Sequence, residues 1–279
     1  RLIGSTSWWY EPSQQWVNGD TYTWVDHSGG NWSQSISAAA AFTMDNASYT
    51  ISAVGFNAVG NPGSKEKLIV IDNTLPAGFI AAPNMPYVNL MPTISGTAAD
   101  PGNIRMPADF DGNIYLRIKD VENGYYWRGS SFSVTVTDLD LPYTAAPTVN
   151  WSTATLVNTG LKDGRRYRVL LFPKDKAGNV EQNEGAMTAY QVLFDTSLPN
   201  SGIGYPGNRY VYRTLAPSTG TALDPPGSNP PSYRSDLDRV ELQIYYPDGP
   251  KYWNGSAFSS NVSSFNIVNG TDTWSYAPP

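Results

Sequence analysis

The segment Asp72-Asn73-Thr74-Leu75-Pro76 recurs as Asp195-Thr196-Ser197-Leu198-Pro199, about 123 residues further along the chain. A second segment, Ser95-Gly96-Thr97-Ala98-Ala99-Asp100, recurs at a similar spacing as Thr219-Gly220-Thr221-Ala222-Leu223-Asp224. Tandem copies of a unit of this size indicate a repeat protein, in which the geometry of one unit, multiplied along the chain, is the product. The sequence therefore says much about architecture and little about any partner.

The repeat divides the 279 residues into one complete copy and two partial copies. Residues 77–199 form the complete copy, residues 1–76 lack the opening strands, and residues 200–279 lack the closing strands. A unit of roughly 120 residues can bury a core without disulfides, in keeping with the absence of cysteine. We expect each partial copy to be completed by another segment, either in a longer chain or from a neighbouring molecule by strand addition.

Alternation of apolar and polar residues with a period of two predicts strands, and helix signals are nearly absent. The expected strands are residues 114–119, 167–172 and 191–194, with counterparts at residues 240–245, 49–54 and 68–71. About seven short strands per copy, separated by Gly- and Pro-rich turns, predict an all-β fold of tandem antiparallel β-sandwiches. The prolines directly after the last strand of a copy predict stiff linkers, because proline fixes φ.

The composition excludes several classes of function. A net charge of −6 and a pI near 4.7 argue against a nucleic-acid partner, since binding phosphates requires clustered Lys and Arg. Arg165, Arg166 and Arg168 lie among acidic residues and are interpreted as a solvated strand face. No apolar run approaches the ~18 residues of a membrane span. Zero cysteine in a chain that looks secreted favours a bacterial or archaeal surface protein.

Catalysis finds almost no support in the sequence. His27 is the single histidine, lies in an expected turn and has no counterpart in the other copies, whereas a Ser/His/Asp triad needs a base held against a nucleophile. Asp138 and Asp140 share a strand face, but nothing indicates the cleft that paired catalytic carboxylates require. We therefore expect no enzymatic activity and no catalytic or cofactor-binding residues.

Acidic residues before the first long strand suggest calcium. They recur in register as Asp100, Asp109 and Asp111 and as Asp224, Asp236 and Asp238. The first set has the D-x-D-G pattern of a calcium loop, but no bidentate Glu follows at loop spacing and prolines crowd the segment. Aspartates that cap turns are the favoured interpretation, so we expect no metal site and a stability nearly independent of calcium.

Aromatic residues recur in register as well, Trp127, Phe132 and Trp151 returning as Trp253, Phe258 and Trp274. We expect Trp127 and Trp151 to be core residues. In the alternative, exposed coplanar rings in each copy would stack on sugars.

With these residues in view, the repeat resembles the immunoglobulin-like repeats of large bacterial surface proteins and adhesins. The resemblance rests on the Ser95–Asp100 strand, the Asp175-Lys176-Ala177-Gly178-Asn179 turn and the closing segment 194–199. The first copy departs from it, with Asn57 in place of Asp175.

The resemblance implies an extracellular structural module, a semi-rigid stalk or filament whose partners are neighbouring repeats or subunits. The alternative is a carbohydrate-binding adhesin segment, or an accessory module of a secreted glycoside-active enzyme, with host or matrix polysaccharide as partner.

Overall fold

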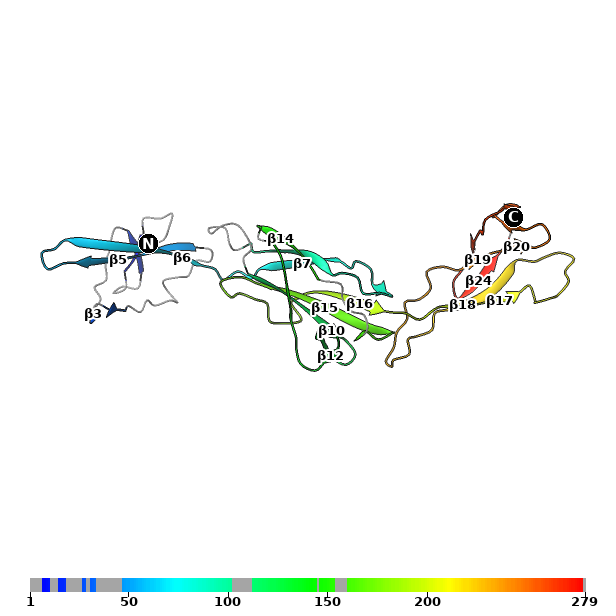
Figure 1. The fold of residues 1–279 in the computed structure, drawn as a ribbon, viewed down its shortest axis with the longest axis horizontal. Coiled ribbons are helices and arrows are strands. Elements are labelled where there is room, and N and C mark those ends of the chain that lie inside the picture. Colours follow the sequence, from blue (N-terminus) through cyan, green and yellow to red (C-terminus); the bar gives the residue numbers. More distant parts are fainter. Residues whose placement is uncertain are drawn as a thin grey trace.

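The computed structural model describes residues 7–10, 15–18, 27–28, 31–33, 47–101, 112–144, 146–153 and 160–277. These residues form strands and turns and no helix, so the all-β prediction is confirmed. Among them, no helix is long and apolar enough to cross a membrane. We call residues 1–76, 77–199 and 200–279 the first, middle and third units, and they follow one another along the long axis of the molecule (Figure 1).

Hairpins make up the described part of the first unit. They pair β1 (Ser7–Tyr10) with β2 (Gln15–Asn18), β3 (His27–Ser28) with β4 (Asn31–Trp32), and β5 (Ala47–Phe56) with β6 (Pro62–Ile71). The β5–β6 hairpin contains the expected strands 49–54 and 68–71. Its turn is closed by the Asn57 side chain, whose Oδ1 accepts hydrogen bonds from the backbone N–H groups of Val59 and Asn61.

Two sheets packed face to face form the middle unit, as expected for a β-sandwich. The smaller sheet has the order β14-β9-β7, with β7 (Ala77–Ala82), β9 (Ser95–Ala99) and β14 (Thr148–Ser152). The larger has the order β12-β11-β10-β15-β16-β8, with β13 also on β10. Its strands are β8 (Tyr87–Val88), β10 (Asn113–Asp120), β11 (Tyr126–Trp127), β12 (Phe132–Ser133), β13 (Leu139–Leu141), β15 (Arg165–Lys174) and β16 (Thr188–Phe194).

One strand departs from the expected antiparallel pairing, since β8 joins β16 in parallel. The backbone N–H of Leu193 donates to Pro86 O, and that of Asp195 donates to Val88 O. This pairing lays the chain that leaves β7 along the last strand of the larger sheet. Neither Tyr87-Val88 nor the parallel pair was anticipated, because two residues are too few to show a period.

The core of the middle unit lies between its two sheets. Burial alternates along β10 as the sequence pattern predicts, with Ile114, Leu116 and Ile118 facing inward. From the opposite sheet, Val149 and Trp151 join the same cluster, and Trp151 is only 2% exposed. Trp127 is buried in this cluster too, so the prediction that both tryptophans are core residues is confirmed.

A glycine–tryptophan contact explains why Gly recurs in the Ser-Gly-Thr-Ala strand. A Cβ on Gly96 would lie 1.8 Å from Phe79 O and 2.7 Å from Cζ2 of Trp151. In the third unit, a Cβ on Gly220 would lie 2.3 Å from Cζ2 of Trp274. Only a residue without a side chain leaves room here for both the carbonyl oxygen of the neighbouring strand and the indole ring.

The third unit is a smaller assembly of sheets. Its strands are β17 (Asn200–Tyr205), β18 (Ser218–Leu223), β19 (Glu241–Leu242), β20 (Tyr245–Tyr246), β21 (Lys251–Trp253), β22 (Phe258–Ser260), β23 (Asn266–Ile267) and β24 (Thr273–Tyr276). They pair as β17-β18-β24, β19-β23 and β20-β21-β22. The strand expected at residues 240–245 is thus split into β19 and β20. In the described residues, nothing here corresponds to β15, which in the middle unit pairs with β10 along its whole length.

Candidate functional site: the junctions between units

The linker between the middle and third units is held by hydrogen bonds to Asp163, in the turn before β15. The Asp163 carboxylate accepts hydrogen bonds from Thr196 N (2.7 Å), Thr196 Oγ1 (3.0 Å) and Ser197 Oγ (2.8 Å). Burial by itself would raise the pKa of Asp163, but hydrogen bonds from Thr196, Ser197 and Ser228 outweigh it and lower the pKa. The carboxylate form of Asp163 therefore fixes the start of the linker.

A loop of the third unit docks against the same turn. Tyr233 donates its backbone N–H to Gly164 O at 2.9 Å, and its hydroxyl accepts a hydrogen bond from Nη2 of Arg166 at 2.7 Å. The Arg166 guanidinium also lies over the Tyr233 ring, 3.9 Å from its centre. The Glu122 carboxylate holds Arg166 in place by accepting a hydrogen bond from Arg166 Nε at 2.8 Å. The cation–π contact and the two hydrogen bonds together join the units.

Two glycines allow the backbones of the middle and third units to come close together. A Cβ on Gly164 would lie 2.8 Å from Gly227 Cα, and a Cβ on Gly227 would lie 2.5 Å from Gly164 N. Gly164 also has a φ of 74°, which residues with a side chain rarely adopt. The backbones of the two units thus meet at a point where neither position has room for a side chain.

Arg165 corrects the interpretation of the basic stretch as a solvated face. Its side chain is buried, with Nε 3.9 Å from Asp120 Oδ2 and Nη1 donating to Pro231 O at 3.4 Å. Burial raises the pKa of Asp120, and the Arg165 charge opposes that rise. The interpretation was wrong here because Arg165 stands at the end of β15 that meets the third unit. The sequence of β15 alone does not show that the third unit lies beside this end of the strand.

The junction between the first and middle units has its own contacts. Asn179, in the D-x-A-G-N turn, donates its side-chain amide to Asp72 O at 2.9 Å, and Pro76 is buried. Thr74 N donates to Asp72 Oδ1, and in the next linker Ser197 N donates to Asp195 Oδ1, both at 3.0 Å. The repeated Asp therefore closes the same tight turn in both linkers.

Three carboxylates converge at this first junction. Oxygen atoms of Asp72, Asp100 and Asp175 all lie within 4.8 Å of one another. Carboxylate oxygens are the ligands that Ca²⁺ and Mg²⁺ prefer, so these residues could hold a divalent cation. Asp175 also keeps the turn-capping role expected of it, accepting hydrogen bonds from Gly178 N and Asn179 N at 2.7 and 2.8 Å.

These three residues were not predicted to lie together, although each belongs to a repeated motif. Asp100 was expected beside Asp109 and Asp111, and these two lie outside the described residues. In the third unit, Asp236 and Asp238 pair instead with Arg234 and Arg239. Asp224 and Asp195 are both buried and joined through Ser235, whose N–H donates to Asp195 Oδ2 and whose hydroxyl donates to Asp224 Oδ2.

The remaining candidate acids, Asp138 and Asp140, contact polar side chains of β10. Arg117 pairs with Asp138 at 2.7 Å and with Glu184 at 2.8 Å, and Lys119 pairs with Glu184 at 2.7 Å. Asp140 accepts a hydrogen bond from the Asn113 side chain. Burial would raise the pKa of Glu184, but hydrogen bonds from Lys119, Arg117 and Tyr126 outweigh it and lower the pKa to about 2. Each acid thus braces a neighbouring strand, and Asp138 and Asp140 have different partners.

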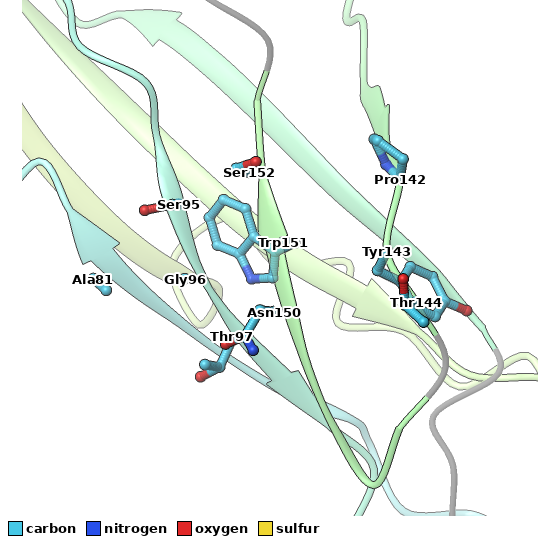
Figure 2. A pocket seen from close by; sticks show the side chains of 10 residues that line it. All are labelled: Ala81, Ser95, Gly96, Thr97, Pro142, Tyr143, Thr144, Asn150, Trp151 and Ser152. Carbon is cyan, nitrogen blue, oxygen red and sulfur yellow. The ribbon is translucent and has the colours of Figure 1, made fainter.

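The core residue Trp151 lines an open groove beside β9 and β14 (Figure 2). Ser95, Thr97 and Asn150 line it with Trp151 and Tyr143. Trp151 is almost wholly buried, so its ring face is not available to stack on a sugar. Tyr143 is engaged as well, because its hydroxyl donates to Gly112 O at 2.5 Å.

His27 lies in β3, where its backbone pairs with that of Trp32. Its side chain lies outside what the structure describes, and the expectation of no enzymatic activity stays a prediction.

No protein-family model matches the chain, and the search of curated proteins found no match. Among solved structures, the chain is similar to one described as the crystal structure of a tetra-tandem repeat in the extending region of a large adhesion protein. The identity is 14% and the TM-score 0.32, and the match covers 82% of this chain and 47% of that one. The chain therefore spans about half the length of that structure.

Proposed function

We propose that this chain is a structural segment of a long bacterial cell-surface protein or extracellular filament. Its stacked sandwiches act as a semi-rigid stalk. The activity is mechanical: each unit holds the next at a set distance, adding roughly 30–40 Å if its strands run 8–10 residues. The partners of such a segment are neighbouring repeats or subunits of the same protein.

The docking of Tyr233 and Gly227 against the turn at Asp163–Arg166 carries this proposal. Linked domains move relative to one another by default unless their interface is substantial. Here the linker and the docked loop are both held by the same four-residue turn. A binding module hung on a flexible tether would have no need for such contacts.

Carbohydrate binding, the alternative function, receives less support. It requires exposed coplanar rings in each copy, yet Trp127, Trp151 and Trp274 are all buried. Their recurrence is accounted for by the core and by the glycine contacts of Gly96 and Gly220.

Small-angle X-ray scattering of the full chain tests the proposal. A stalk predicts a scattering profile that one elongated particle fits, and a maximum dimension that is independent of ionic strength. A profile that only an ensemble of differently bent conformers fits would contradict it. Binding to a glycan array, lost on substituting exposed aromatic residues, would favour the alternative.

A further inference from the structure

The first and last strands of the middle unit are the ones that a pull along the chain loads. Tension in a stalk enters this unit before β7 and leaves it after β16, because the two linkers adjoin these strands. We call residues 78–88 the entry segment and residues 188–195 the exit segment. How these two segments contact each other decides how the unit responds to tension.

Side-chain hydrogen bonds join the entry segment to the exit segment near the start of each. Thr188 Oγ1 donates to Gly78 O at 3.0 Å, and the Tyr190 hydroxyl donates to Met85 O. A Cβ on Gly78 would lie 2.6 Å from Cδ2 of Leu171, the residue of β15 that pairs with Thr188. The start of β7 therefore lies close against β15 and β16.

Backbone hydrogen bonds continue the contact towards the far end of both segments. Leu193 N donates to Pro86 O at 2.8 Å, and Asp195 N donates to Val88 O at 2.9 Å. Val88 and Leu193 are each only 7% exposed. Water therefore has little access to these bonds, and a hydrogen bond in such surroundings is electrostatically stronger than one in water.

The two segments run in the same direction. Their partners occur in rising order along both, from Gly78 with Thr188 to Val88 with Asp195, and β8 pairs with β16 in parallel. Pulling the start of one segment against the end of the other slides the two past each other. The four hydrogen bonds that join them in the described part of the chain lie across this direction, so they share the load. An antiparallel pair pulled by its adjacent ends would open one bond at a time.

We propose that the entry and exit segments form a clamp that carries tension through the middle unit. Force passes from one linker to the next across their shared hydrogen bonds. Sliding would also drag Val88 and Phe194 out of the core, where both side chains are buried. The inference rests on the proposed stalk function, because only a chain under tension uses the clamp.

Single-molecule force spectroscopy of the full chain in two pulling directions tests the clamp. The chain has no cysteine, so handles can be attached at pairs of exposed residues replaced by cysteine. Leu75→Cys with Leu198→Cys loads the two segments along their length. Leu90→Cys with Leu198→Cys instead pulls apart the adjoining ends of the same segments, beyond Val88 and Asp195.

The rupture force should be about two- to fourfold higher along the length, since four bonds share the load there and one bond at a time carries it in peeling. Both pairs of handles lie in or beside the same folded unit, so a difference in force reports the direction of loading. Equal rupture forces in the two directions would overturn the clamp. They would leave the stalk intact, because scattering measures how the units are arranged and these handles load the middle unit alone.

Thr188→Val combined with Tyr190→Phe tests the contribution of the hydrogen bonds, since it removes two of the four. The rupture force along the length should fall by about half. The peeling force should stay the same, because these two bonds open last in that direction, and this also shows that the variant is folded.

Tyr143→Phe is the matched control. It too removes a half-buried hydroxyl that donates to a backbone carbonyl, that of Gly112, but this bond lies outside both segments. The control should change neither force. An unchanged force along the length in the double variant, or an equal loss in Tyr143→Phe, would also overturn the proposal.

Discussion

The guanidinium of Arg166 in the middle unit lies 3.9 Å from the ring centre of Tyr233 in the third unit and donates a hydrogen bond to its hydroxyl. The two residues are 67 positions apart in the chain and belong to different units. Their contact therefore reports directly on whether the units are fixed to one another. The contact also places Arg166 at the centre of the junction, although the sequence predicted that this residue lies on a solvated strand face.

Tyr233→Ala should loosen the second junction without unfolding either unit. Losing the stacking and the hydroxyl bond removes about 1–2 kcal/mol of docking free energy, which corresponds to an open population about 5- to 30-fold larger. The rate of limited proteolysis in residues 195–199 measures this population. Tyr246→Ala, at an exposed position of β20 in the third unit, is the matched control. Equal cleavage rates in the two variants would show that the contact contributes nothing.

Trp127→Ala and Trp151→Ala should each lower the free energy of unfolding by ~3–5 kcal/mol, as large-to-small changes in a core do. Urea denaturation checks this. Unfolding at the same urea concentration as the parent, together with lost affinity for a polysaccharide, would instead assign these residues to a binding surface.

The sequence predicted the middle unit well and the junctions poorly. Residues 114–119 and 167–172 were identified as strands because their alternation is long enough to show a period, and β10 and β15 contain them. Arg165 was misassigned because its burial depends on Pro231 and Asp120, contacts that no local pattern encodes.

The acidic residues show the same limit. Asp72, Asp100 and Asp175 each stood out in a repeated motif, but their motifs lie far apart in the sequence. Only the fold brings the linker, the end of β9 and the turn after β15 to one point. Gly96 is the opposite case. Its recurrence was visible in the sequence, but the cause, the close approach of Phe79 O and of the Trp151 ring, required the structure.

Acid should weaken the middle unit through Glu184. Its pKa in the folded chain is about 2, below its ordinary 4.5. The contribution of Glu184 is therefore fully present above about pH 4.5 and is lost as the pH falls towards 2. Glu184→Gln should flatten the dependence of the melting temperature on pH over that window, and Glu66→Gln on the β5–β6 hairpin should not. An unchanged pH profile in Glu184→Gln would rule out this role.

Calcium should stabilise the first junction. Oxygen atoms of three carboxylates lie within 4.8 Å of one another, and an ion bound only by the folded chain would stabilise it by mass action. The sequence alone predicted calcium independence, which stays untested, and the proximity of Asp72, Asp100 and Asp175 favours the opposite outcome. Millimolar calcium should raise the melting temperature of the parent and of Asp238→Asn, but not that of Asp175→Asn. If calcium does not raise the melting temperature of the parent chain, these aspartates serve only as turn caps.

Pulsed electron paramagnetic resonance between spin labels at Val134→Cys and Val262→Cys tests whether the middle and third units are held at a fixed separation. Val134 is exposed in the middle unit and Val262 is exposed in the third. A fixed separation predicts a single narrow distance distribution that broadens in Gly227→Ala, where a Cβ would strike the backbone of Asp163 and Gly164. Gly202→Ala, which has room for a methyl group, should leave it narrow. A broad distribution in the parent chain, indistinguishable from that of Gly227→Ala, would contradict the claim.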